Sequence, residues 1–164
     1  MGSNTEYQTI VIEWYGPVSW ETIEDLDAGG LYLFTGRQKY QRKDAVQYIG
    51  ITEGRYRTRF SRHHKAEFIV HNLRCWVGQV KHPSDLGRVG LERAESMLVY
   101  FACPDLNERK TVRPPRPTAV ISHWFNEHST PRYNRQGIFK DFPDVISWDG
   151  EHWREGNLRV WDEV

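Results

Sequence analysis

Alternating apolar and polar positions divide much of the chain into short segments. The two-residue period and the β-branched and aromatic residues in these segments predict strands at residues 7–16, 31–36, 46–52 and 72–80. We expect Gly16-Pro17 to end the first of them. Two further short strands are predicted in the aromatic tail, around Asp149-Gly150 and Gly156-Asn157.

Three other segments carry helical signals. Ser19 is a suitable N-cap for a short helix over 20–26, and a basic helix is predicted after Gly54 over 55–68. A third helix is expected over 90–102, after the turn and possible cap at Pro83-Ser84-Asp85. Pro104 should end this helix. Strands and helices mix without a regular alternation, which favours an α+β fold with a small mixed sheet.

The chain has 164 residues and is 38% hydrophobic, which suits one globular domain. No run of about eighteen apolar residues is present, so we expect no membrane span. Cys75 and Cys103 are the only cysteines and lack metal-binding spacing, so a reducing cytoplasm is the expected location.

Net charge is zero, but its distribution is uneven. Residues 31–65 hold nine Lys or Arg against two acids, and residues 108–140 are also basic, whereas residues 1–30 and 141–164 are acidic. Two basic segments on a neutral body could form a positive groove for phosphate backbones. The alternative is that basic and acidic segments pair with each other.

The helix after Gly54 places two reactive side chains beside its apolar stripe. Tyr56 and Phe60 are four residues apart and should face the core together. Arg59 and His63 share the same spacing about 60° to the side, on the rim of the buried face. A solvated basic helix is the simpler alternative.

The helix over 90–102 supplies a carboxylate. Glu95 falls within the apolar stripe of Leu91, Leu98 and Ala102, where a carboxylate needs an arginine or a metal ion as a partner. A structural pair with Arg59 would satisfy it. With Tyr32 and Tyr48 these residues could instead supply what phosphodiester hydrolysis needs, namely activated water, fixed positive charge and a proton donor.

Four motifs occur in the order seen in one enzyme family. Gly30-Leu31-Tyr32 and Tyr48-Ile49-Gly50 are followed by Arg59 and His63, then by Glu95, and finally by Pro104, Leu106 and Asn107. Together they resemble the GIY-YIG nucleases over about residues 29–107. Leu31 replaces the usual isoleucine, and the two tyrosines are sixteen residues apart, farther than in most of the family.

The resemblance implies a fold and a set of roles. The fold is a small three-stranded antiparallel sheet flanked by helices. Tyr32 would position or deprotonate the attacking water with Tyr48 beside it, and Arg59 would steady the scissile phosphate. His63 would assist proton transfer, Glu95 would bind one Mg²⁺ or Mn²⁺, and Asn107 would buttress the site. Arg57 is the second choice for the catalytic arginine.

We therefore expect a GIY-YIG-type endonuclease core over 29–107. Residues 1–28 would form an N-terminal extension with a strand and a helix, and residues 108–164 a basic proline-rich linker and an aromatic extension packing on the core. The expected partner is DNA, most readily duplex. Its predicted contacts are Arg37, Lys39, Arg42, Lys43, Arg55, Arg57, Arg62, Lys65, Arg109, Lys110 and Arg113.

Other interpretations remain. A nuclease-like module could bind nucleic acid or a protein without cutting, although the residues matching the metal-binding Glu and the catalytic Tyr are both present. The acids of the Pro104-Asp105…Glu108-Arg109-Lys110 string are too crowded for the PD…ExK nuclease class. His123 and His128 are spaced for a polar loop rather than a metal site. Monomer and homodimer both stay open, because double-strand cutting requires two active sites or sequential nicks.

Overall fold

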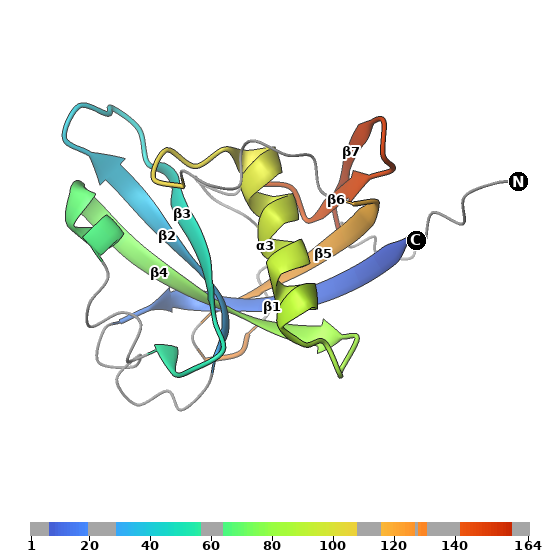
Figure 1. The fold of residues 1–164 in the computed structure, drawn as a ribbon. Coiled ribbons are helices and arrows are strands. Elements are labelled where there is room, and N and C mark those ends of the chain that lie inside the picture. Colours follow the sequence, from blue (N-terminus) through green and yellow to red (C-terminus); the bar gives the residue numbers. More distant parts are fainter. Residues whose placement is uncertain are drawn as a thin grey trace, which may run out of the picture.

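The computed structural model describes residues 7–19, 29–56, 64–107, 116–126, 128–130 and 142–158. Within these ranges the chain forms seven strands, the α-helix α3 (Arg88–Ala102) and the short 3-10 helix η1 (His64–Phe68) (Figure 1). The strands are β1 (Gln8–Val18), β2 (Gly30–Gln38), β3 (Ala45–Thr52), β4 (Ile69–His82), β5 (Thr118–Phe125), β6 (Val145–Trp148) and β7 (Trp153–Gly156).

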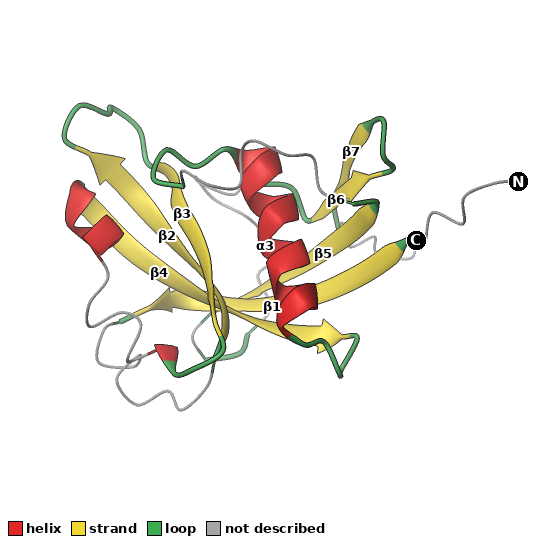
Figure 2. Cartoon of the chain, in the orientation of Figure 1, coloured by secondary structure: helices red, strands yellow, loops and turns green. Residues whose placement is uncertain are grey.

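All seven strands belong to one curled sheet with the order β3-β2-β4-β1-β5-β6-β7. Neighbouring strands are antiparallel except for β1 and β5, which are parallel. Helix α3 lies across the sheet and contacts β3 and β2 on one flank and β5 and β6 on the other (Figure 2). The helix therefore covers the inner face of the curled sheet.

The expected small three-stranded sheet flanked by helices is wrong. Strands β3, β2 and β4 are antiparallel neighbours, but β1 pairs with β4 and extends the sheet to β5, β6 and β7. The physical reason is that β4 would have an unpaired edge in a three-stranded sheet, and β1 pairs with that edge. Residues assigned to an N-terminal and a C-terminal extension thus form part of the same sheet as β2 and β3.

The inner face of the sheet holds the larger apolar core. Every second residue of β1 points inward, so Ile10, Ile12 and Trp14 are fully buried. They pack with Leu31 and Leu33 of β2 and with other inward side chains, which are Ile49, Trp76, Val120, Trp124, Ile146, Ala94, Met97, Leu98 and Val99. At about 25 cal/mol per Å² of apolar surface, this burial is the main source of stability.

The outer face holds a second cluster with a different composition. Tyr32 and Phe34 of β2 alternate with Leu31 and Leu33 and so point away from α3. They pack with Tyr56 and with Val18, Ile69, Cys75, Val77 and Leu106, and Tyr48 lies against the cluster. Burial raises the pKa of the Cys75 thiol, so this cysteine is held as a protonated apolar side chain.

Several predicted elements are confirmed, and others are wrong or only partly described. β2, β3 and α3 match the segments 31–36, 46–52 and 90–102 within two residues, and the chain turns at Asp149-Gly150 between β6 and β7. The second strand predicted in the tail, over 158–164, lies outside the described residues except for Leu158. β1 continues through Gly16-Pro17 with an irregular register, so the expected break there is wrong. The predicted helix over 20–26 lies outside the described residues, and that over 55–68 is described only at its ends.

Strand β5 was missed, and the expected polar loop at His123 is a strand. Its buried positions include Thr118 and Ser122, whose polarity hides the alternation. Inside the fold, Trp14 Nε1 donates to Ser122 Oγ at 3.1 Å. Among the described helices, none has the length and apolar character needed to cross a bilayer.

Candidate active site

The two tripeptides of the sequence motif lie on paired strands. In the β2–β3 register Tyr32 is opposite Gly50 and Phe34 is opposite Tyr48. Both tyrosines point to the outer face, with ring centroids 6.0 Å apart. Tyr32 is fully buried, whereas Tyr48 is partly exposed. Tyr48 is therefore the member of the pair that solvent reaches.

Gly50 leaves the space in which the Tyr32 ring lies. A Cβ at position 50 would be 2.4 Å from Tyr32 Oη and 2.5 Å from its Cζ, which is closer than atoms can approach. A side chain at this position would therefore displace the buried phenol. Gly50, the last residue of Tyr48-Ile49-Gly50, therefore makes room for Tyr32, the last residue of Gly30-Leu31-Tyr32.

Tyr56 holds the beginning of β2 against β4. Its hydroxyl lies 2.9 Å from Leu31 O and 3.0 Å from Gly78 O, and Gln79 Nε2 donates to it at 3.2 Å. Burial raises the pKa of Tyr56 well above its ordinary value, so the hydroxyl stays protonated and donates. Gly30, at φ 149°, fits here because a Cβ would meet Gly78 O and Tyr56 Oη.

Asn107 closes the outer edge of β3. Ile49 N donates to Asn107 Oδ1 at 2.9 Å, and Asn107 Nδ2 donates to Ile49 O at 2.7 Å. Leu106 N also donates to Gln47 O at 3.1 Å. The segment after α3 thus satisfies backbone groups that an edge strand otherwise leaves exposed. It also fixes the strand that carries Tyr48.

Glu95 lies on α3, which covers the face of the sheet opposite the tyrosines. The side chain is only 8% exposed. Arg93, 200° away around the helix, contacts Pro117 and Thr118 at the start of β5, so Glu95 faces the other flank, where β3 lies. The helix that carries Glu95 and the two tyrosines therefore lie on opposite faces of the sheet.

Both ends of α3 are linked to β3 and its flanking residues. Near the start of the helix, Arg88 Nη1 lies 3.5 Å from Glu53 Oε2, just after β3. Beyond the end of the helix, Asn107 binds the main chain of Ile49 in β3.

The described residues contain no group of three or more His, Cys, Asp or Glu that could hold a metal ion. Mg²⁺ does not require such a group, because it is commonly bound by one or two carboxylates, waters and substrate phosphates. The single carboxylate of Glu95 fits that kind of site. The predicted site residues Arg59 and His63, and the second-choice Arg57, lie outside the described residues.

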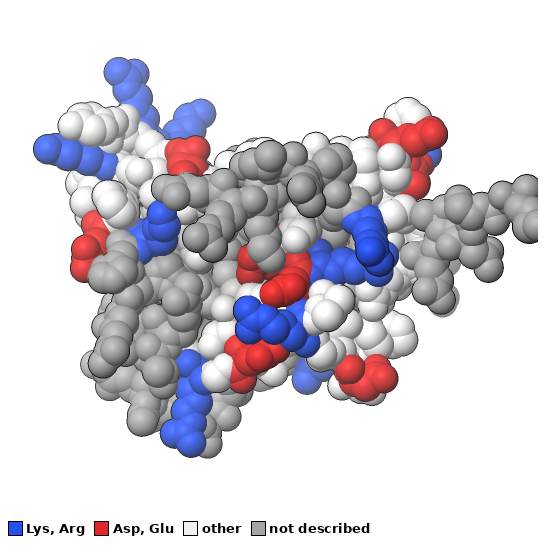
Figure 3. Space-filling view, viewed as in Figure 1, with Lys and Arg blue, Asp and Glu red and all other residues white. Residues whose placement is uncertain are grey.

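The basic residues predicted to contact DNA differ in their surroundings. Lys39, Arg42 and Lys43 are exposed in the β2–β3 loop, and Lys and Arg side chains project from this end of the molecule in Figure 3. Arg37, by contrast, forms an ion pair with Asp44 at 2.9 Å, which offsets its charge. Arg55 is exposed and Lys65 is half-buried. The other predicted DNA contacts lie outside the described residues; they are Arg57, Arg62, Arg109, Lys110 and Arg113.

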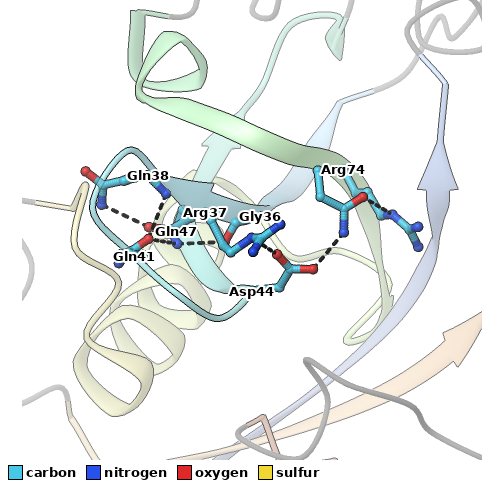
Figure 4. A network of polar contacts seen from close by, with 8 residues as sticks. Gly36, Arg37, Gln38, Gln41, Asp44, Gln47 and Arg74 are labelled. Atoms are coloured by element: carbon cyan, nitrogen blue, oxygen red, sulfur yellow. Dashed lines mark hydrogen bonds and ion pairs between the residues drawn. The ribbon is translucent and has the colours of Figure 1, made fainter.

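A glutamine network beneath this loop was not predicted from the sequence. Gln41 Oε1 accepts from Gln38 N at 2.8 Å and from Gln47 Nε2 at 2.7 Å (Figure 4). Gln47 Nε2 also donates to Gly36 O, and Gln41 Nε2 donates to Asp105 Oδ2 at 2.8 Å. The only sequence signal was three glutamines in ten residues, which by itself indicates an ordinary polar loop.

Comparison with known proteins assigns no family. No family model matches the chain, and neither a curated protein nor a solved structure matches it at a significant level.

Proposed function

We propose that the protein is a metal-dependent endonuclease of the GIY-YIG type that hydrolyses phosphodiester bonds in DNA. The observation that carries the proposal is the seating of Tyr32 over Gly50 on paired strands, with Tyr48 beside it. Two tripeptides sixteen residues apart meet in register, and the glycine of one makes room for the tyrosine of the other. A chance match of two ordinary tripeptides does not require this pairing.

The roles follow from chemistry and exposure. Tyr48 is the partly exposed member of the pair, so water and the scissile phosphate would approach from its side, with Tyr32 behind it. Asn107 would act as a positioning residue, because it binds the main chain of Ile49 next to Tyr48. Arg59 and His63 would supply fixed charge and proton transfer.

Glu95 would hold Mg²⁺ or Mn²⁺ near the edge of β3. A hard divalent cation bound there would neutralise charge that develops on the phosphate. A low exposed fraction suits a carboxylate that binds a cation away from bulk water.

Plasmid cleavage tests the proposal. The wild-type protein with Mg²⁺ should nick or linearise supercoiled DNA. Tyr48→Phe and Glu95→Gln should each lower the rate by about a hundredfold or more, because Tyr48 is the phenol that solvent reaches and Glu95 is the proposed metal ligand. Tyr100→Phe and Glu92→Gln are matched controls on α3. Tyr100 stacks on Trp153 and Glu92 pairs with Arg88, so both variants should cut normally.

Two results would contradict the proposal. One is a wild-type protein that leaves duplex, single-stranded and RNA substrates intact in both Mg²⁺ and Mn²⁺. The other is undiminished cleavage by Tyr48→Phe and Glu95→Gln. If the inert protein still retained DNA in a salt-dependent manner, the non-cutting binding module would be the better description.

A further inference from the structure

The tip of the β2–β3 loop presents an aromatic ring to solvent. Tyr40 is 90% exposed, more than any other exposed large hydrophobic residue in the described part of the chain. A single exposed aromatic residue is by itself unremarkable in a protein surface. This one lies among Lys39, Arg42 and Lys43, and Lys39 Nζ is 5.8 Å from the ring centroid. An aromatic ring among cations is the combination that binds single-stranded nucleic acid.

The turn that carries Tyr40 is held in place. Gln41 N donates to Gln38 O at 3.1 Å, which closes a β-turn with Tyr40 at its third position. The Gln41 side chain then accepts from Gln38 N and Gln47 Nε2 (Figure 4). It also donates to Asp105 Oδ2 at 2.8 Å. Because these contacts fix the residues on both sides of Tyr40, the ring is presented with little loss of backbone freedom on binding.

The other side of the loop is also tied down. Asp44 pairs with Arg37 at 2.9 Å and accepts from Asn72 Nδ2 at 2.7 Å, which links the loop to β4. Asp44 is the one acidic residue of the loop, and its charge is offset by Arg37. The charge of the loop around Tyr40 is therefore positive.

A second exposed aromatic residue lies at the same end of the sheet. Gln38 of β2 is in register with Ile69 of β4, so Phe68, which precedes Ile69, is next to the start of the loop. Phe68 is 56% exposed. Glu67 beside it is exposed and acidic, which makes Phe68 a weaker contact for a phosphate-bearing ligand than Tyr40.

We propose that Tyr40 stacks on an unpaired nucleobase while Lys39, Arg42 and Lys43 contact the flanking phosphates. This inference rests on the proposed nuclease function and names its substrate class as DNA with a single-stranded stretch. In a continuous duplex the faces of the bases are covered by their neighbours, so only the phosphate contacts would be available. The loop would therefore favour a single strand, a flap or a bulge over blunt duplex.

Binding in EDTA tests the inference without any cleavage. The probes are a fluorescein-labelled DNA single strand of about twelve nucleotides, within the usual site size, its RNA counterpart and the blunt duplex of the same sequence. Tyr40→Ala should weaken single-strand binding about tenfold and change duplex binding less than about twofold. Tyr40→Phe should bind as the wild type does, because stacking uses the ring and not the hydroxyl.

Salt dependence separates stacking from charge. Tyr40→Ala should keep the slope of log K against log salt, because it removes no phosphate contact. Lys43→Gln should lower that slope by about 0.7 on the single strand. A 2-aminopurine base in the strand should lose fluorescence on binding to the wild type and not to Tyr40→Ala. Tyr7→Ala, at an exposed tyrosine before β1, is the matched control and should change none of these values.

The outcomes distinguish this inference from the nuclease proposal. Equal single-strand affinity for Tyr40→Ala and the wild type would overturn it, and so would an equal loss on single strand and duplex. If the protein cuts DNA but Tyr40→Ala has no effect, only the stacking role fails. If it binds single strands through Tyr40 but cuts nothing under any metal condition, the stacking role stands and the nuclease proposal fails. Equal losses on DNA and RNA would show recognition of the base face in either nucleic acid.

Discussion

The two faces of β2 and β3 are built from different kinds of residue. Inward positions are aliphatic, such as Leu31, Leu33 and Ile49, and they pack against α3. Outward positions are tyrosine and phenylalanine, such as Tyr32 and Phe34, and they form a smaller cluster. A branched aliphatic core gains stability from packing, whereas phenol hydroxyls can also act on water and phosphate. We expect damage to the inner face to reduce stability and damage to the outer face to reduce activity.

The largest expected effect on stability is on the inner face. Leu33→Ala should lower the free energy of unfolding by about 3 kcal/mol, because it leaves a cavity beneath α3. Urea unfolding followed by tryptophan fluorescence measures the change. The outer-face control Tyr32→Phe should cost no more than about 1 kcal/mol. Equal losses from the two variants would remove the contrast between the faces.

Gly50→Ala tests how tightly the outer face is fitted. The added methyl group would overlap the Tyr32 ring, so we expect a loss of about 2 kcal/mol in unfolding free energy. DNA cleavage should fall as well, since the phenol moves. Gly54→Ala is the matched control, because its Cβ would lie 3.8 Å from the nearest atom, Thr52 Oγ1. A Gly50→Ala protein with normal stability and activity would mean that Tyr32 can relocate freely.

Asn107 binds the main chain at the edge of β3, the strand that carries residues of both faces. Its loss should have an intermediate effect on stability. Asn107→Ala leaves Ile49 N and O without their partner, at a cost of about 1–2 kcal/mol in unfolding free energy. Asn107→Asp should lose less, because it keeps an acceptor for Ile49 N. Hydrogen exchange at the Ile49 amide reports the contact directly. Unchanged protection of that amide in Asn107→Ala would exclude the edge-closing role.

The smallest expected effect concerns another tyrosine beside the outer cluster. Burial raises the pKa of Tyr15 to about 12, and both the hydrogen bond it donates to Glu13 and the charge of that carboxylate add to the rise. Because folding raises this pKa above 10, the stability it contributes is complete below pH 10 and is lost as the pH rises toward 12. Tyr15→Phe should flatten this decline in urea unfolding measured at successive pH values. An identical decline in the variant would show that other groups cause it.

Local patterns were sufficient for part of the fold. β2, β3 and α3 were predicted because their periodicity and the proline after the helix are signals carried by neighbouring residues. β5 was not, because its buried Thr118 and Ser122 break the apolar pattern, and Ser122 becomes acceptable only when Trp14 donates to it. The size of the sheet could not be predicted, since β1 pairs with a parallel strand about 110 residues away.

The candidate site shows the same division. The sequence by itself supplied the motif order that nominates the candidate side chains, because motif order is a property of the chain. That Tyr32 and Tyr48 share a face follows from the β2–β3 register, which only the structure supplies. Only the tertiary structure decided that Tyr32 is buried over Gly50, that the helix carrying Glu95 covers the opposite face of the sheet, and that Tyr40 lies in a hydrogen-bonded turn. These depend on register and on contacts between distant residues, which no local pattern records.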